Sequence, residues 1–181
     1  MKERPILFSA PMVRAILEGR KTQTRRVVKR LNPEHPVLAG EAILRMCPYG
    51  QPGDRLWVRE TFAYAHNDDG VPQSPERFLY AATENWEGRS VPSIHMPRRA
   101  SRITLEIVAV RVERLNQMQA HDAMREGIVW NKTCGYTADG IFGDRGNPVT
   151  TFYYLWEQLN GLGSWQTNPW VWVIEFKKLT A

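Results

Sequence analysis

The stretch RITLEIVAVRVERL, residues 102–115, has the apolar pattern of a long β-strand. Its apolar side chains move from odd to even positions along the stretch: Ile103, Leu105 and Ile107, then Val108, Val110 and Val112. Successive side chains of a strand point to opposite faces, so this change of phase indicates a strand that is buried on both faces or bent by a bulge. Small β-barrels contain such strands, and we predict one here.

Two further stretches have strand patterns. In DRLWVRETF, residues 54–62, the apolar side chains Leu56, Val58 and Phe62 share one face, on which Glu60 also falls. In NPWVWVIEF, residues 168–176, one face carries Trp170, Trp172, Ile174 and Phe176. Both patterns predict strands that contribute to the core.

Three stretches have helical patterns. PMVRAILEG, residues 11–19, has Pro11 in its first turn and Gly19 at the position of a C-terminal cap. AHDAMREG, residues 120–127, predicts a short helix that ends at a glycine. NPVTTFYYLWEQLNG, residues 147–161, predicts a longer helix with Asn147 as its cap, Pro148 in its first turn, and an apolar stripe of Phe152, Leu155, Trp156 and Leu159. The helical spacing favours a core role for this stripe.

The order of these elements predicts an α+β fold, a small and mostly antiparallel β-barrel with short helices over its openings. We expect one domain over residues 1–181. Three segments rich in Gly, Pro, Asn and Asp, at 64–77, 84–97 and 130–147, are expected to be surface excursions of this domain.

Composition restricts the functional classes. The chain has 181 residues, 43% of them hydrophobic and 24% charged, and a formal net charge of +5, which is typical of an ordinary globular protein. Cys47 and Cys134 form neither a disulfide framework nor a zinc pattern, and the four histidines lack metal-ligand spacing, so we expect no metal or cofactor. The apolar runs are too short for a signal peptide or a membrane span, and we expect a cytoplasmic protein.

The octet GRKTQTRR, residues 19–26, is the most unusual local feature of the chain. It follows the first predicted helix and contains Arg20, Lys21, Arg25 and Arg26. Such a cluster is either a phosphate-binding patch or a site in which neighbouring cations favour a neutral Lys21, because a nearby positive charge disfavours its proton. A neutral amine is the kind of base that the hydroxyl of Thr24 needs to become a nucleophile. A solvated helix end is the ordinary alternative for such residues.

Several segments together resemble the ASCH-domain proteins, a branch of the PUA-like superfamily, and most closely their phage- and prophage-encoded members. They are PILFSAPMVRAILEGRKTQTRR (5–26), GDRLWVRETF (53–62), SIHMPRRASRITLEI (93–107) and NPWVWVIEF (168–176). The parts ILEGRKTQTRR and GDRL are also similar to compact bacterial ASCH enzymes that hydrolyse N4-acetylcytidine. Arg99 stands where we expect tryptophan in the phage-type proteins.

The resemblance implies a PUA-like barrel and a metal-independent amidohydrolase that acts on N4-acylated cytosine nucleosides. It implies a catalytic set of Lys21, Thr24 and Glu126, the last in AHDAMREG. Thr24 would be the nucleophile and Lys21 its base. A carboxylate raises the pKa of a neighbouring lysine, so Glu126 is interpreted as a group that orients the substrate or passes a proton to the leaving amine.

Four further residues are candidates for substrate binding: Arg26, Glu60, Arg59 and Trp57. Glu60 is either a paired buried carboxylate or a hydrogen-bonding group for a base edge, and Trp57 is either packing or a stacking platform. Arg59 points away from Glu60.

The second functional hypothesis is an RNA-binding PUA-like module, or an ASCH-type ribonuclease derived from one. Expected partners are a modified cytosine nucleoside and possibly RNA, with no membrane; the sequence does not indicate the oligomeric state.

Overall fold

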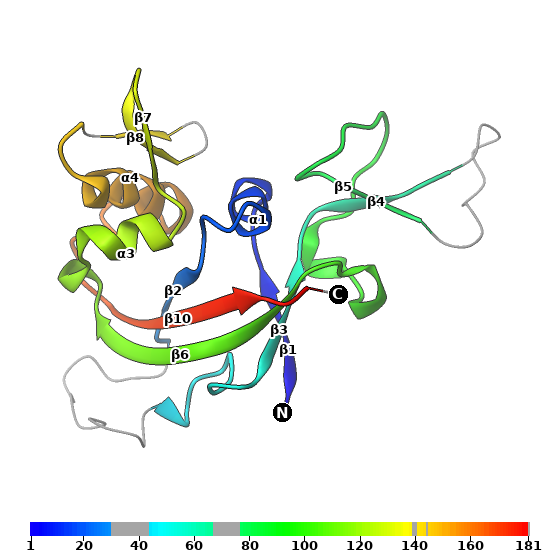
Figure 1. The fold of residues 1–181 in the computed structure, drawn as a ribbon, viewed down its shortest axis with the longest axis horizontal. Helices are drawn as coiled ribbons and strands as arrows, with labels where there is room; N and C mark the ends of the chain where they lie inside the picture. The colour runs from blue at the N-terminus through cyan, green and yellow to red at the C-terminus, as the bar shows by residue number, and fades with distance from the viewer. Residues whose placement is uncertain (30–43, 67–76, 139–140, 144, 181) are drawn as a thin grey trace.

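A five-stranded sheet forms the centre of the protein in the computed structural model, which describes residues 1–29, 44–66, 77–138, 141–143 and 145–180 (Figure 1). In spatial order its strands are β1 (Glu3–Leu7), β3 (Arg55–Arg59), β6 (Thr104–Arg114), β10 (Trp170–Lys178) and β2 (Gln23–Val27). Only the β1–β3 pair of this sheet is parallel. The fold is therefore α+β and mostly antiparallel, as predicted.

The long strand β6 contains a bulge, which was one of the two alternatives that its apolar pattern left open. Ile107 pairs with Phe176 of β10 and Ala109 pairs with Glu175, so Val108 has no partner in the ladder. Val108 is 51% exposed, whereas Ile107 and Val110 on either side are buried. The extra residue lets the strand bend and reverses the faces on which its side chains lie, which explains the change of apolar phase.

Strand β10 separates two apolar cores. Trp172, Ile174 and Phe176 pack in a core with residues of β1 and β3 and with helix α1 (Ala10–Leu17). Val171 and Val173 face the opposite core, which includes residues of α3 (Ala120–Arg125) and α4 (Pro148–Asn160). The sequence predicted one apolar face for this strand, and the structure shows that both faces of β10 are apolar and buried.

Helix α4 begins as its sequence predicts. The side chain of Asn147 accepts a hydrogen bond of 2.9 Å from Val149 N, and Pro148 occupies the first turn. Phe152 and Trp156 are buried, but Leu159 at the end of the predicted stripe is 53% exposed. The stripe therefore passes from the core to the surface.

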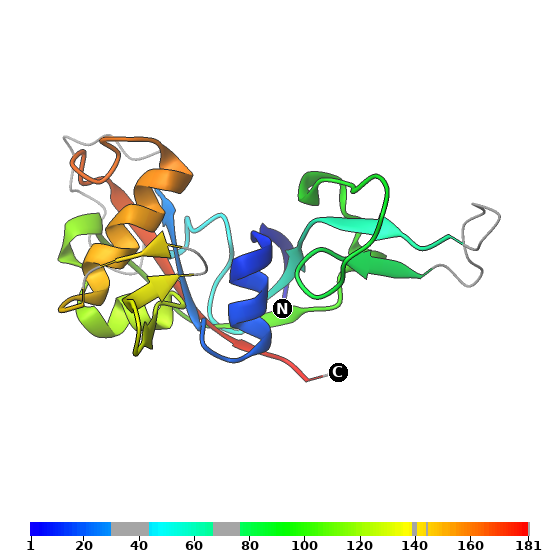
Figure 2. The same ribbon diagram turned by 90° about the horizontal axis from the view of Figure 1, so that it is seen from above.

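Two small sheets flank the centre. β4 (Phe62–Tyr64) and β5 (Phe78–Tyr80) form a ladder on one side of α1, and β7 (Val129–Asn131), β8 (Gly135–Ala138) and β9 (Ile141–Phe142) lie with α4 on the other (Figure 2). Single 3-10 turns are η1 (Ser93–His95), η2 (Arg98–Ala100) and η3 (Leu115–Gln117). Of the predicted excursions, 64–77 lies between β4 and β5, 84–97 contains η1, and 130–147 contains β8 and β9. Residues 67–76, 139–140 and 144 lie outside the described residues.

The central sheet is open between its two edge strands. No ladder joins β1 to β2 in the described part of the chain, so the predicted barrel is not closed by backbone hydrogen bonds there. A side chain bridges the opening instead, because Arg26 Nη2 of β2 donates to the carbonyl oxygen of Leu7 in β1, at 2.6 Å. We call this opening the seam.

No helix within the described ranges has the length and apolar character needed to cross a bilayer.

Candidate active site at the seam

Lys21 and Glu126 form a buried ion pair beside the seam. Lys21 Nζ lies 2.7 Å from Glu126 Oε2 and donates a second hydrogen bond of 3.0 Å to the carbonyl oxygen of Glu126. Only 2% of Lys21 and 4% of Glu126 are exposed. The resemblance to ASCH enzymes implied that these two residues belong to a catalytic set. The fold brings them together although they are 105 positions apart in the sequence.

Backbone hydrogen bonds at the C-terminal ends of helices α1 and α3 hold this pair in place. The backbone N–H groups of Arg20 and Lys21 both donate to the carbonyl oxygen of Ala15, and Thr22 N donates to the carbonyl oxygen of Arg125. Gly127 allows the two helices to approach, since a Cβ there would lie 3.2 Å from Ala15 Cβ and its φ of +104° favours glycine. Gly127, the glycine of AHDAMREG, therefore permits the close contact between the end of α3 and the octet.

Arg25 connects Glu126 to two other carboxylates. Its guanidinium lies 2.5 Å from Glu113 Oε1, 3.1 Å from Asp122 Oδ2 and 3.2 Å from Glu126 Oε1. Its side chain is fully buried. Arg25 is therefore an internal structural cation and is not displayed for a phosphate.

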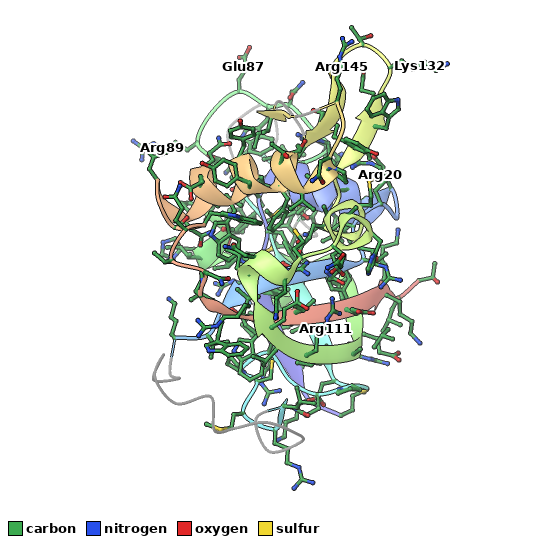
Figure 3. The ribbon with its side chains drawn as sticks, turned by 90° about the vertical axis from the view of Figure 1, so that its left-hand side faces the viewer. Arg20, Glu87, Arg89, Arg111, Lys132 and Arg145 are labelled. Carbon is green, nitrogen blue, oxygen red and sulfur yellow. The ribbon has the colours of Figure 1, made fainter. Side chains whose placement is uncertain are left out.

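A second arginine extends this network along the sheet. Arg111, which projects from β6 (Figure 3), lies 2.9 Å from Asp122 Oδ1, 3.1 Å from Glu113 Oε2, and also pairs with Glu175. This network was not predicted from the sequence. Two signals were available: Arg111 and Glu113 are two apart on one strand face, and Asp122 of α3 lies one turn before Glu126, the residue that caps this helix.

A cleft of about 600 Å³ opens at the seam. Its walls come from the end of β1, from α1, β2 and α4, and include Phe8, Thr24, Arg26, Tyr49, Glu126 and Trp156. Thr24 and Arg26 share one face of β2, because they pair with Ile174 and Trp172 of β10. The octet thus continues from the helix end into a buried strand, and the solvated-end alternative does not apply to Thr24, which is only 3% exposed.

Burial lowers the pKa of the Lys21 amine, and it is the largest influence on that group. The charge and hydrogen bond of Glu126 act in the opposite direction, while the charges of Arg26 and Arg25 lower the pKa further. From the sequence, the neighbouring cations are the expected main cause of a lowered Lys21 pKa. In the folded protein their charges add to a larger effect of desolvation.

Three buried donors of cleft-lining residues have no acceptor within the described structure: Arg25 Nε, Arg26 Nε and Trp156 Nε1. Buried polar groups are normally hydrogen-bonded, so these donors are candidates for binding acceptor atoms of a ligand. The guanidinium of Arg26 lies 5.3 Å from the centre of the Phe8 ring, which helps to fix its plane. Burial lowers the pKa of Arg26, yet an arginine stays charged in proteins.

The other three predicted binding residues lie elsewhere. Glu60, 1% exposed, forms a two-point pair with Arg102, with contacts of 3.0 and 3.1 Å. Arg59 donates to the carbonyl oxygen of Ile94, and its guanidinium lies 5.4 Å from the centre of the Trp57 ring. None of Glu60, Arg59 and Trp57 lines the cleft at the seam. For Glu60 the structure shows the paired buried carboxylate of the two alternatives.

Metal-ligating side chains do not cluster in the described ranges: no three of His, Cys, Asp and Glu are placed to hold an ion. The carboxylates of Glu113, Asp122 and Glu126 are instead taken by arginine and lysine. The site offers an amine, a hydroxyl and a carboxylate, which are the groups of general acid–base and nucleophilic catalysis.

No family model matches the chain, and no curated protein sequence matches it. Among solved structures, the chain is similar to an ASCH domain from Lactobacillus crispatus, with 16% identity and a TM-score of 0.42 over 98% of this chain and 79% of that one. It is also similar to an Enterococcus faecalis protein of the family DUF984, with 10% identity and a TM-score of 0.43 over 99% of this chain and 81% of that one.

Proposed function

We propose that this protein hydrolyses the amide bond of N4-acylated cytosine nucleosides, with Thr24 as nucleophile, Lys21 as its base and Glu126 as the group that passes the proton on. One observation carries the proposal: the carboxylate of a buried lysine–carboxylate pair, Glu126, lines a cleft to which Thr24 also contributes. A hydroxyl nucleophile needs an adjacent base, and burial favours the neutral, basic form of Lys21.

The reaction runs in two steps. The Thr24 hydroxyl attacks the acyl carbonyl carbon and gives its proton to the neutral Lys21 amine. Glu126, hydrogen-bonded to Lys21, relays a proton to the N4 atom as the carbon–nitrogen bond breaks, which leaves cytidine and an ester on Thr24. Water then cleaves the ester, which releases a carboxylic acid and restores the hydroxyl.

The cleft suits a nucleoside in size and chemistry. Its volume of about 600 Å³ lies within the usual range of small-molecule sites. Phe8, Tyr49 and Trp156 supply aromatic walls for a planar ring. The unpaired donors Arg26 Nε and Trp156 Nε1 match the acceptor atoms that a cytosine ring and an acyl oxygen present.

The pairing of the octet weighs against the alternative of a phosphate-binding RNA module. Arg20 Nε lies 2.5 Å from Glu18, Lys21 pairs with Glu126, and Arg25 is surrounded by carboxylates. A phosphate would have to compete with each of these anions. Arg26 donates to a neutral carbonyl oxygen, and no carboxylate in the described structure pairs with its charge. A single cation of this kind binds the phosphate backbone of a nucleic acid only weakly.

The test is direct incubation with N4-acetylcytidine, followed by the ultraviolet change to cytidine. The wild-type protein should produce cytidine, and Thr24→Val should not, because valine keeps the shape and loses the hydroxyl. Thr22→Val is the matched control: it lies in the same octet but is exposed, and should retain activity. Absence of product with the wild-type protein, or equal turnover by Thr24→Val, contradicts the proposal.

A further inference from the structure

A second cavity of about 290 Å³ adjoins the cleft at the seam. Ser9, Met12, Glu126, Leu155 and Leu159 line both cavities. Glu126 is among them, so the carboxylate of the buried ion pair borders both spaces, whereas Lys21 lines neither. Thr24 lines only the larger one.

The walls of the second cavity are mainly apolar. Beyond the shared residues they include Pro11 and Ala15 of α1, and Ala138 and Ile141 of β8 and β9. Its one cation, Arg20, is held by Glu18 and by the carbonyl oxygen of Gly127. Such walls favour an uncharged aliphatic group over a polar one.

We propose that the second cavity binds the acyl group of the substrate, and that this group is an aliphatic chain several carbons longer than acetyl. The inference rests on the proposed function. A scissile amide has a cytosine on its nitrogen side and an acyl chain on its carbon side, and Glu126 stands where the two cavities meet. The smaller space equals the volume of about ten liquid water molecules, which an acetyl methyl group leaves largely empty.

The wall supplied by β8 and β9 sets this specificity. Ala138 and Ile141 belong to the segment 130–147, which the sequence analysis expected to be a surface excursion. Together with Leu155 of α4 they enclose the second cavity on the side opposite α1. These two residues of the excursion are thus part of the substrate site.

The first experiment compares kcat/KM for N4-acetyl-, N4-butanoyl- and N4-hexanoylcytidine. Each methylene that leaves water for an apolar wall should raise kcat/KM by about fourfold, so hexanoyl should exceed acetyl by well over tenfold. Hydrolysis of acetylcytidine with no gain for longer chains overturns the acyl cavity and leaves the proposed function standing.

A binding experiment separates the two proposals. N4-ethylcytidine and N4-hexylcytidine are amines without a scissile amide, so their affinities for the wild-type protein report on the cavity alone. Calorimetry should show at least tenfold tighter binding of the hexyl compound. Tighter binding of the hexyl compound without hydrolysis of any acylcytidine supports the acyl cavity and contradicts the proposed amidohydrolase function. Equal affinities of the two compounds contradict the acyl cavity.

Gln158→Trp tests the position of the acyl group. Gln158 is an exposed residue of α4 that lines only the second cavity, so a larger side chain narrows that space with little effect on folding. We expect the ratio of kcat/KM for hexanoylcytidine to kcat/KM for acetylcytidine to fall at least tenfold. Tyr154→Trp, one turn earlier on the same helix and in neither cavity, is the control. An unchanged hexanoyl preference in Gln158→Trp overturns the assignment.

Discussion

The Nζ atom of Lys21 and the Oε2 atom of Glu126 are 2.7 Å apart in a part of the molecule that is almost closed to water. Arg25 contacts the other oxygen of the same carboxylate. Buried ion pairs add little to stability compared with apolar packing, because desolvation offsets the attraction. A pair of this kind, whose carboxylate lines a cleft, is therefore better explained by chemistry than by stability.

Replacement of Lys21 should abolish hydrolysis whatever the charge of the new residue. Arginine keeps the charge but cannot lose its proton, and methionine keeps the shape of the stem but has no base. Both Lys21→Arg and Lys21→Met should lose roughly a hundredfold or more in kcat, the usual contribution of a general base. Turnover of N4-acetylcytidine is the measurement, with circular dichroism to check the fold. Near-normal activity of Lys21→Arg contradicts the role of base.

The activity should rise with pH as Lys21 loses its proton, with an apparent pKa below the ordinary lysine value of about 10.4. The charge of Arg26 lowers the pKa of Lys21, so Arg26→Gln should move the rising limb of kcat/KM to higher pH. Arg20→Gln is the control, because Arg20 is not among the charges that act on Lys21. Identical pH profiles for wild type and Arg26→Gln are incompatible with this account.

Stability should depend on pH through the same lysine. The folded protein holds the Lys21 proton less tightly than the unfolded chain does, so between the lowered pKa and about 10.4 the unfolded chain binds more protons. The free energy of unfolding of the wild type, relative to Lys21→Met, should therefore rise with pH across that window. Urea unfolding at several pH values measures it. A difference that falls with rising pH indicates a raised pKa instead.

Loss of Arg25 should destabilise the protein severely. Arg25→Gln leaves Glu113, Asp122 and Glu126 without their shared cation in a buried site, which should cost about 3–5 kcal/mol. Arg98→Gln, which removes a half-exposed pair with Glu3, should cost no more than about 1 kcal/mol. Chemical denaturation of both variants gives the comparison. Similar small losses in the two variants contradict the network.

Binding of single-stranded RNA should be weak and only slightly dependent on salt. Each phosphate neutralised contributes slightly less than one decade of affinity per decade of salt, and the octet offers about one cation that no carboxylate pairs. Filter retention between low and moderate salt measures the slope. Tight binding with a slope of several units favours the RNA-binding module over the hydrolase.

Local sequence determined the elements whose signals are local. Asn147 and Pro148 start α4 because their side chains act within one turn, and the change of apolar phase in 102–115 records the bulge at Val108. The position of Glu60 on an apolar strand face gave a paired buried carboxylate as one of two alternatives, and the structure shows that one. These features depend on neighbours in sequence, so a single sequence contains them.

Tertiary structure alone decided what the octet is. The same residue types are also typical of a solvated, phosphate-binding surface. Lys21 and Arg25 are buried here because they pair with carboxylates that are distant in sequence: Glu113, Asp122 and Glu126. The same contacts exclude water from Lys21, and this burial, which no residue count reveals, is the main reason that its pKa falls. The chain supplied the lysine and the threonine, whereas the packing of α3 against β2 buries the amine, lowers its pKa and places Glu126 at the cleft.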